Sequence, residues 1–585
     1  MYFLLLAILS LMLLPYILTK QIGRKSIHPP GPLGLPFIGN LHQFDKARPH
    51  LYLWKLSQKY GPLAYLKLGS TPVLVVSTAK MAKEFLQNQD FVFCSRPQVL
   101  GQQKLSYNGL GIAFSPYNEH WKEMRKICVH HLFSHKQVLS FRPIREDEVS
   151  HMVNKISKLA FSSELVNLSK IAMSLASNLI CRVAFGTRYD DEEYEKKRFE
   201  RLVMEAQALM VGFYFSDYFP LLGWLDKFTK KSDRLEKNFK ELDLFYQELI
   251  DHHLNPSRPK ENDILDLLLK LKDQNSSSIN LTWDHIKALL MDLFVAGTDT
   301  VAASLVWTMT ALMMRPCIMK EAQTEIRNLI GEKGTVSEED IKKLPYLKAV
   351  IMETLRLYPP APLIFRKETT EGYCSTINGY KIQPGTRIFI NGWAISRDAE
   401  AWQNPDTFLP ERFINSKKVE DFAMIPFGGG RRGCPGMSMG LISLELALAN
   451  LLYTFDWELP YGTKMEDIDT DVLPGLTTHK KNALLLRPKK DAETWQNPDT
   501  FLPQRFINSK KVEDFAMIPF GGGRRGCPGM SMGLISLELA IANLLYTFDW
   551  ELPYGMKMED IDTDVLPGLT MHKKNALLLL PKKYI

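Results

Sequence analysis

Apolar residues recur every three or four positions over much of this chain, a spacing that predicts amphipathic helices. The stretch 117–330 is mostly of this kind, with long charged examples at 192–211 and 235–254. Residues 286–314 differ, because they form a long and mainly apolar run. A helix that is apolar all round is typical of a protein interior. This run is therefore the best candidate for a central buried helix.

A second pattern, the alternation of apolar and β-branched residues, predicts short strands. It occurs over residues 63–77 and again over 377–390. The regular exchange of strand and helix that builds a parallel α/β sheet does not occur. The predicted fold class is therefore mainly α with minor β. A chain of 585 residues, 45% of them hydrophobic, can form one large core or two ordinary domains.

The start of the chain carries a different signal. Residues 1–19 have no charged side chain, and the basic residues Lys20, Arg24 and Lys25 follow them. This order predicts a short transmembrane anchor with a luminal N-terminus and a cytosolic body. A cleaved signal peptide would instead have basic residues first and a small-residue cleavage site after the apolar run. Residues 20–40 are basic and proline-rich, and they read as a stiff hinge.

The C-terminal part of the chain is duplicated. Residues 398–490 (copy one) and 491–583 (copy two) align at a constant offset of 93, with six differences. Repeat architectures stack several modular units, so two near-identical copies indicate a recent duplication or a faulty exon join. We therefore expect the main domain at 41–490, with 491–585 as a surplus duplicate. The differing pairs are Ala401/Thr494, Glu411/Gln504, Leu448/Ile541, Thr463/Met556, Thr478/Met571 and Arg487/Leu580.

Charge and cysteine content exclude some classes of function. The net charge of +7 is modest for this length and gives nucleic-acid binding no support. Seven cysteines are scattered without zinc-site or C-x-x-C spacing, which indicates a reducing compartment rather than a disulfide framework.

A glycine-rich loop that ends in a cysteine carries the most specific signal. The pattern occurs in both copies, and in copy one it reads Phe427-x-x-Gly430-x-Arg432-x-Cys434-x-Gly436. An apolar helix predicted at 435–455 puts Cys434 just before a helix N-terminus, where free N–H groups and the helix dipole favour a thiolate. The glycines from Gly428 onward let the backbone approach a flat, bulky group. This setting suits the axial ligand of a haem, with Arg432 neutralising an anion; a buried structural cysteine is the alternative.

On this loop and the motifs below, the chain resembles the cytochrome P450 haem-thiolate monooxygenases of the plant microsomal kind, and in particular the branch that includes aldoxime-oxidising enzymes. The resemblance covers essentially residues 1–490. It implies the cytochrome P450 fold, a single large haem-binding domain with an N-terminal membrane anchor. It also implies haem b as cofactor, Cys434 as the iron ligand, and Phe427, Gly428 and Gly436 around the cofactor.

The predicted central helix contains Ala296-Gly297-Thr298-Asp299-Thr300. Small residues at 296 and 297 leave room for a diatomic ligand, and an acid followed by a hydroxyl can relay protons. Alone the motif is weak, because Thr and Asp in helices more often cap or bond to carbonyls. The resemblance assigns oxygen activation to Thr300 and proton delivery to Asp299.

The two propionates of a haem require hydrogen-bond donors and cations. Trp121 and Arg125 lie one turn apart on a predicted helix. The resemblance adds Arg366, and Arg432 completes the set. Each of these residues alone would be taken for a surface residue.

Glu353 and Arg356 share one face of another predicted helix, a spacing usual for surface ion pairs. By resemblance Arg412 joins them. We interpret the three as structural support for the haem loop rather than as catalytic residues.

The resemblance implies a monooxygenase of the endoplasmic reticulum membrane, with a cytosolic catalytic domain. It would use O2 and NADPH electrons, delivered by a flavoprotein reductase, to oxidise a small hydrophobic plant metabolite. Lys122, Lys126 and Lys418 would surround the cysteine face and dock the reductase; a solvated surface is the equal alternative. By resemblance, substrate contacts come from 98–114, 212–224, 292–296 and 363–365.

Two alternatives to a monooxygenase are consistent with the cysteine loop. A haem-thiolate isomerase or dehydratase would not use O2, and enzymes of that kind depart from the family in the relay motif or the cysteine loop, both of which are intact here. A non-functional product would result if the duplicate prevented folding.

Overall fold

A computed structural model of the chain describes residues 28–583, except 163, 190–193, 260–261, 275–278, 369–374, 415–420, 491–526, 563 and 567–571. The chain divides into two compact units, Met1–Ala492 and Glu493–Ile585, each of which is described by itself. The predicted anchor at 1–19, and the hinge up to residue 27, lie outside the described residues.

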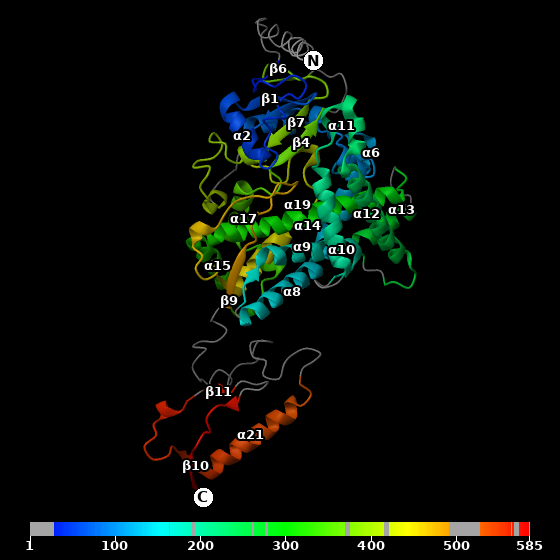
Figure 1. Cartoon of the computed structure of the whole chain (residues 1–585). Coiled ribbons are helices and arrows are strands. Elements are labelled where there is room, and N and C mark those ends of the chain that lie inside the picture. Colours follow the sequence, from blue (N-terminus) through cyan, green and yellow to red (C-terminus); the bar gives the residue numbers. More distant parts are fainter. Residues whose placement is uncertain are drawn as a thin grey trace, which may run out of the picture. The chain divides into compact units, whose positions relative to one another are not determined.

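Unit 1 is built around one long helix, α14 (Trp283–Met313), as predicted. Thr282 caps its start by accepting the backbone N–H of His285, whose ring in turn accepts the N–H of Thr282. Most of its side chains are buried. Helices α9 (Leu168–Phe185) and α19 (Met437–Thr454) pack against it, and α14 runs through the middle of the body in Figure 1.

The remaining helices of unit 1 enclose this centre, and their apolar faces supply two large buried clusters. The longer ones are α2 (Pro49–Tyr60), α6 (Glu119–Ile127), α8 (Arg142–Phe161), α10 (Tyr194–Met210), α12 (Lys230–Leu254), α13 (Ile264–Asp273), α15 (Pro316–Ile330) and α17 (Pro345–Leu357). The shorter ones are α3 (Ala79–Lys83), α4 (Asp90–Phe93), α5 (Leu100–Leu105), α7 (His135–Ser140), α11 (Phe215–Tyr218), α16 (Glu338–Ile341) and α18 (Gly392–Ile395).

The β content is small, and only part of it lies in the two stretches, 63–77 and 377–390, where the alternation predicted strands. Strands β1 (Leu63–Leu68), β2 (Thr71–Val76), β7 (Arg387–Asn391) and β4 (Leu363–Lys367) form one sheet in that order, with only β2 and β7 parallel. The short pair β5 (Thr376–Ile377) and β6 (Tyr380–Lys381) stands alone. A third sheet has the order β3 (Val166–Asn167), β9 (Leu485–Lys490) and β8 (Phe455–Glu458), so the end of copy one pairs with a distant part of the body.

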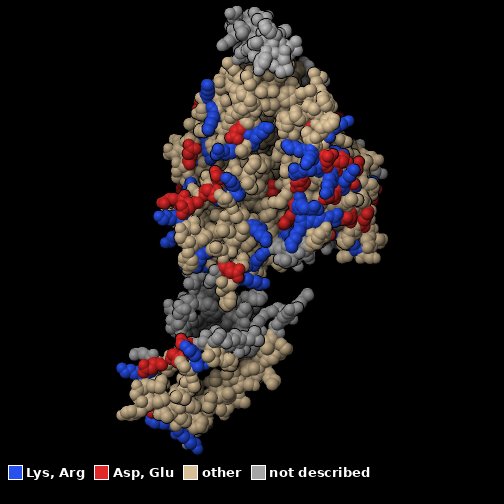
Figure 2. All heavy atoms as spheres, viewed as in Figure 1, with Lys and Arg blue, Asp and Glu red and all other residues tan. Residues whose placement is uncertain are grey.

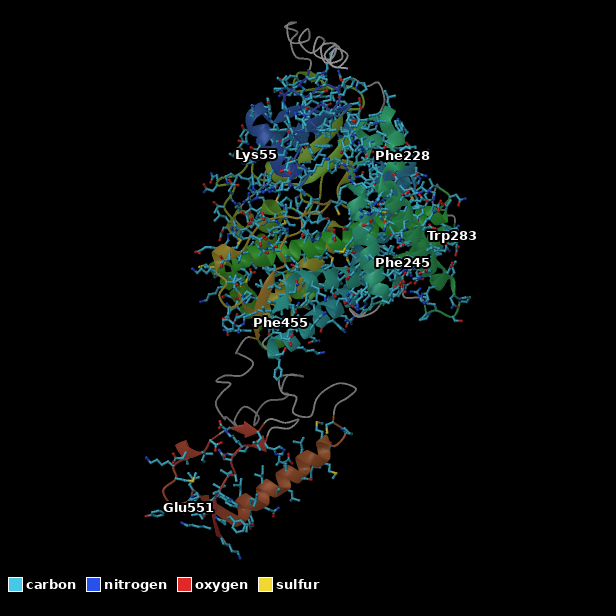
Figure 3. The ribbon with its side chains drawn as sticks, viewed as in Figure 1. Lys55, Phe228, Phe245, Trp283, Phe455 and Glu551 are labelled. Carbon is cyan, nitrogen blue, oxygen red and sulfur yellow. The ribbon has the colours of Figure 1, made fainter. Side chains whose placement is uncertain are left out.

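Helices α10 and α12 form a charged face of unit 1. Arg198 pairs with Glu248 at 2.7 Å and Arg234 with Glu205 at 2.8 Å. Figure 2 shows both signs of charge interspersed over this region, while Figure 3 labels Phe245, which faces the core from α12. Exposed pairs of this kind each contribute less than about 1 kcal/mol, so burial of the apolar faces stabilises these helices.

Unit 2 has the same local structure as the end of copy one. Its helix α21 (Met530–Thr547) leads into β10 (Phe548–Glu551), which pairs with β13 (Leu580–Lys583). A small ladder joins β11 (Val565–Leu566) to β12 (His572–Lys573). Trp550 donates its indole N–H to the Leu544 carbonyl at 3.2 Å, as Trp457 does to Leu451 at 3.0 Å. The described residues of α21, however, include no buried side chain.

Four helices of the described residues are long and apolar enough to cross a membrane, by length and composition alone. Three of them, α9, α14 and α19, are core helices of unit 1, with at least half of the most apolar stretch buried. The fourth is α21, of which no residue in that stretch is buried.

Candidate functional site

The cysteine loop is a tight turn held by its own backbone. The N–H of Cys434 donates to the Phe427 carbonyl at 2.9 Å. Gly436 is the N-cap of α19, so Cys434 lies just before the helix, as the sequence predicts. Gly428 and Gly430 have φ of +70° and +62°, a region that side chains with a Cβ rarely adopt. A Cβ on Gly430 would also collide with the carboxylate of Asp90. The loop therefore requires glycine at these positions.

Two opposite effects act on the pKa of the Cys434 thiol. Burial raises the pKa of the Cys434 thiol, while the backbone N–H of Gly436 and the charge of Arg125 lower it. The raising effect is the larger, so the helix terminus alone does not yield the thiolate that the sequence pattern led us to expect. A cation bound directly to the sulfur would reverse this balance, because metal coordination deprotonates a thiol.

The residue Cys434 is also exposed, although protein atoms surround most of its thiol. A second residue of this kind is Ala296, which is exposed although it lies in the middle of the buried helix α14. The cysteine loop and the middle of α14 therefore each leave one small residue uncovered by protein atoms. Helix α19, which follows the cysteine loop, approaches α14, since a Cβ on Gly440 would lie 4.0 Å from Cγ2 of Val301.

The relay motif on α14 is arranged partly as expected. Thr300 is half-buried and donates its hydroxyl to the carbonyl of the exposed Ala296 at 2.7 Å. Gly297 differs from the expectation that it leaves room for a diatomic ligand. A Cβ there would lie 2.7 Å from Cδ1 of Ile180, so this glycine permits close packing against α9.

Asp299 is buried, and its carboxylate lies 3.2 Å from Nε2 of His479. The sequence analysis missed His479, because 180 residues separate the two and no motif connects them. His479 follows Thr478, one of the six positions that differ between the copies.

Buried arginines gather beside the cysteine loop. Arg366, on β4, is 1% exposed and donates to the Gly429 carbonyl at 3.0 Å. Its Nε and Nη1 have no hydrogen-bond partner among the described residues. Burial lowers the pKa of Arg366 to about 10 and that of Arg432 to about 9, and in Arg432 the charge of Arg366 adds to the effect.

Arg432 and Trp121 bind the protein itself. The Arg432 guanidinium donates to the carbonyls of Cys94, Ile112 and Ser115, and lies over the Trp121 ring at 4.4 Å. The Trp121 indole N–H donates to the Ile112 carbonyl at 3.0 Å. This differs from the expectation that both aim their N–H groups at a propionate. In this structure they fasten the cysteine loop to the segment before α6.

Arg125 is the third predicted cation, and its Nη2 donates to the Gly433 carbonyl at 2.6 Å. Arg96 joins the cluster although the sequence analysis missed it. It donates to the carbonyls of Ala113 and Phe365, and burial together with the charges of Arg366 and Arg432 lowers its pKa well below the usual value. A single arginine before a proline gives no signal in a sequence.

This cluster fits a buried dianion. Four arginines lie within one charged neighbourhood, and the acidic groups near them are Asp90 and Asp292. Burial raises the pKa of Asp292 to about 6, which weakens its role as a counter-charge. Unpartnered buried N–H groups on Arg366 cost free energy unless an acceptor reaches them. The two carboxylates of a haem would supply such acceptors, and Cys434 offers a sulfur that could bind its iron.

The ion-pair network predicted around Glu353 is present. Glu353 and Arg356 are fully buried and joined by two hydrogen bonds of 2.7 and 2.8 Å. Nε of Arg412 lies 3.3 Å from the same carboxylate, which also accepts the Leu409 N–H. The network therefore holds the 405–412 segment of copy one against α17.

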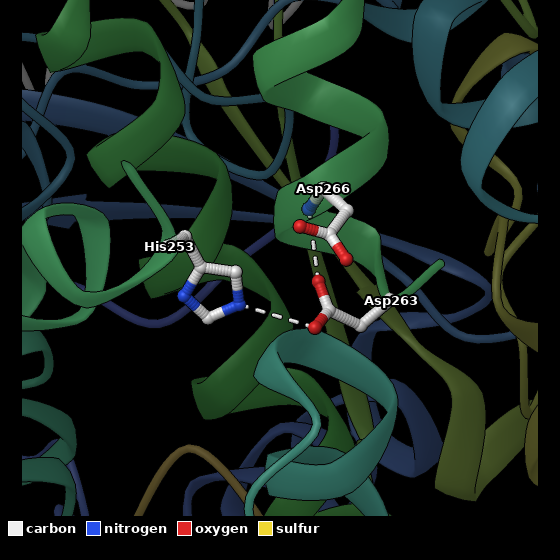
Figure 4. A group of neighbouring side chains, drawn as sticks. All are labelled: His253, Asp263 and Asp266. Atoms are coloured by element: carbon white, nitrogen blue, oxygen red, sulfur yellow. Dashed lines mark hydrogen bonds and ion pairs between the residues drawn. The ribbon is translucent and has the colours of Figure 1, made fainter. Parts of the chain in front are cut away.

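A group of possible metal ligands elsewhere has a structural role. His253, Asp263 and Asp266 converge near the start of α13 (Figure 4). Arg258 already donates to Asp263 at 2.8 Å and to Asp266 at 3.1 Å, and Asp263 caps α13. Although burial opposes it, hydrogen bonding to His253 and other donors lowers the pKa of Asp263. The group closes a turn rather than offering open ligands.

Of the lysines predicted around the cysteine face, Lys122 and Lys126 lie on α6. Lys122 pairs with Glu119 at 2.6 Å, and Lys126 with Glu123 at 3.9 Å. Lys418 lies outside the described residues.

Comparison with known proteins gives one consistent answer. The family model "Cytochrome P450" matches residues 29–487 and again 483–580. The 6,7,8-trihydroxycoumarin synthase of Pastinaca sativa is 50% identical over 498 residues, which cover 83% of this chain and 97% of that enzyme. The 5-OH-xanthotoxin synthase of the same plant is 50% identical, over 80% of this chain and 94% of its own length. The strychnine-11-hydroxylase of Strychnos nux-vomica is 46% identical, over 80% and 92%.

Proposed function

The chain belongs to the cytochrome P450 family, and from this premise we propose how its own residues serve the reaction. The protein is a haem-thiolate monooxygenase of plant metabolism, an oxidoreductase that uses haem b and reductase-delivered NADPH electrons. Bound haem supplies the site at which O2 is reduced and activated.

We assign Cys434 as the ligand of the haem iron. The support is its place at the end of a glycine turn, where it is exposed and a backbone N–H lies on the sulfur. Arg366 is the foremost propionate partner because its buried N–H groups lack acceptors. Arg125, Arg432 and Trp121 hold the loop and add positive charge, while Phe427, Gly428 and Gly436 shape the turn.

Thr300 and Asp299 are the proposed proton carriers. The Thr300 hydroxyl stands one helical turn from the accessible Ala296, and its bond to that carbonyl fixes the direction of its lone pairs. Asp299 is the adjacent acid. A carboxyl group and a hydroxyl in sequence can pass protons from outside to a buried acceptor.

The proposed substrate is a small, hydrophobic plant metabolite, with a coumarin-type aromatic ring system as the first class to test. Two relatives that are 50% identical carry coumarin and xanthotoxin in their names. The narrower expectation of an aldoxime substrate stays a prediction.

We further propose attachment to the endoplasmic reticulum membrane through residues 1–19, with the catalytic body in the cytosol. Exposed apolar side chains of unit 1 support contact with a lipid surface. Near the first described residues these are Leu33 and Phe37, and on the segment after α11 they are Leu221 and Phe228, the last labelled in Figure 3. Lys122 and Lys126 would contribute to reductase docking.

The single observation that carries the assignment is the accessible Cys434 beside partly unpartnered Arg366. The test is the carbon monoxide difference spectrum of the reduced protein, followed by turnover of simple coumarins with NADPH and a plant reductase. We expect a thiolate spectrum and a hydroxylated product. A spectrum without the thiolate signature would contradict the assignment of Cys434. A thiolate spectrum with peroxide rearrangement independent of O2 would favour an isomerase.

A further inference from the structure

A histidine from the end of copy one reaches the acid of the relay motif. Nε2 of His479 lies 3.2 Å from Oδ2 of Asp299. The carboxylate is 7% exposed and the imidazole 26% exposed. The pair therefore connects a buried acid on the central helix with a ring that solvent can reach.

The loop around His479 is held in place from both sides. Thr478 donates its N–H to the Pro360 carbonyl and its hydroxyl to the Pro359 carbonyl, each at 2.8 Å. Its own carbonyl accepts the indole N–H of Trp307, on α14, at 2.8 Å. The ring position is therefore set by the same helix that carries Asp299.

Neighbouring charges are already paired. Lys480 lies 2.6 Å from Asp469, and Lys481 lies 3.9 Å from Asp471. In the described part of the chain, His479 is the one ion-pair partner recorded for Asp299. The orientation of the Asp299 carboxylate thus depends on this ring.

We propose that His479 is a positioning residue for proton delivery, which holds the Asp299 carboxylate toward Thr300 and links it to solvent. The proposal rests on the function given above. Monooxygenation consumes O2, two electrons from NADPH and two protons, and it yields one hydroxylated product and one water. When proton delivery fails, the same two electrons and two protons reduce O2 to hydrogen peroxide and the substrate is not oxidised. Product formed per NADPH therefore reports on proton delivery.

The test compares H479A and H479Q in the full-length, haem-loaded protein. For H479A we expect product per NADPH to fall about tenfold, and hydrogen peroxide to rise correspondingly. This fall is smaller than the roughly 10²-fold loss expected for D299N, which removes a general acid. H479Q keeps an N–H donor and should recover much of the loss. Thr478→Met introduces the residue that copy two has at this position, removes the hydroxyl bond to Pro359, and should give an intermediate effect.

Two further measurements separate positioning from mere folding. In D299N/H479A the two effects should not multiply, because the ring acts through the acid. The same double-mutant cycle on the denaturant midpoint of unfolding should also show coupling, a readout that does not depend on turnover. His572, the equivalent residue in copy two, is the matched control. H572A should leave the product formed per NADPH unchanged.

Independent effects of D299N and H479A on product per NADPH would overturn the proposal. An H479A variant that forms as much product per NADPH as the wild-type protein would also overturn it. A lost thiolate spectrum in the wild-type protein would instead contradict the proposed function, so the two failures are distinguishable.

Discussion

Helices α19 and α21 share 17 of their 18 residues and have opposite surroundings. Leu446 of α19 is 0% exposed, whereas its equivalent in α21, Leu539, is 64% exposed. Both helices are followed by the same strand and the same tryptophan hydrogen bond. The local sequence therefore specifies the helix and the turn. Burial depends in addition on an apolar surface for the helix to pack against, and in unit 1 α19 occupies that surface.

The partners of Asn450 make the same point with one side chain. Its amide donates to the Leu446 carbonyl within α19, and also to the Val336 carbonyl of the body. The equivalent Asn543 donates to Leu539 at 2.7 Å within α21. Copy two thus retains the local bond, and the additional bond of copy one comes from α19 packing against the body.

The strongest test of this difference exchanges each cysteine for serine. We expect C434S to abolish the thiolate signature in the carbon monoxide difference spectrum, because copy one packs against α14 and α17. C527S should leave the spectrum unchanged. Loss of signal in C527S alone would mean that copy two has taken over the site.

A core substitution comes next in size. Leu446→Ala should lower the free energy of unfolding of unit 1 by about 2–5 kcal/mol, since it removes fully buried methyl groups and leaves a cavity. The matched change L539A should alter it by less than about 0.5 kcal/mol, as expected for an exposed site. Denaturant unfolding followed by haem absorbance measures both. Equal losses would show that the two helices share the core.

An acid titration should give a smaller effect. Although burial opposes it, hydrogen bonds from Lys480 and Asn482 lower the pKa of Asp469, and the Lys573 bond lowers that of Asp562 in unit 2. A carboxyl group whose pKa is lower in the folded state stabilises the fold at pH values above its unfolded pKa of 3.8. This stabilisation is lost as the pH falls through the folded pKa.

Asp469→Asn should therefore destabilise unit 1 at pH 6 by less than about 1 kcal/mol. The difference from wild type should shrink below pH 3.8. D562N should not change unfolding of unit 1 at either pH. A constant difference for D469N across this range would contradict the assigned pKa shift.

Deletion of residues 491–585 should have the smallest effect on the site. Residues up to Lys490 hold one of each required motif, so we expect a chain that ends at Lys490 to take up haem and keep its spectrum. It should also be more soluble, because the exposed apolar face of α21 is gone. If this shorter chain expresses without haem while the full chain takes it up, the second copy is required.

Much of this fold follows from local patterns. The central helix, the first β hairpin and the helix after the cysteine were predicted because periodicity and glycine turns act over a few residues. The spacing of Glu353 and Arg356 predicted their pairing, while the resemblance, not the local pattern, added Arg412. The anchor predicted at 1–19 lies outside the described residues.

The parts that were missed depend on partners far away in the sequence. Arg96 contacts Phe365, 269 positions away, and His479 contacts Asp299, which is 180 positions away. The direction of the Trp121 indole and the face of Gly297 are set by packing, which periodicity cannot specify. The contrast between the copies was also beyond local patterns, because nearly identical segments give identical predictions.

The order of the copies along the chain has a consequence in time. Strand β9 closes unit 1 by pairing with β3 and β8, and all of these residues precede copy two. At a synthesis rate of about 5–20 residues per second, copy one leaves the ribosome roughly 5–20 s before the whole of copy two. Folding of a helical body begins well within that interval. Copy one thus has a head start at the ribosome, and the later copy meets a surface already covered.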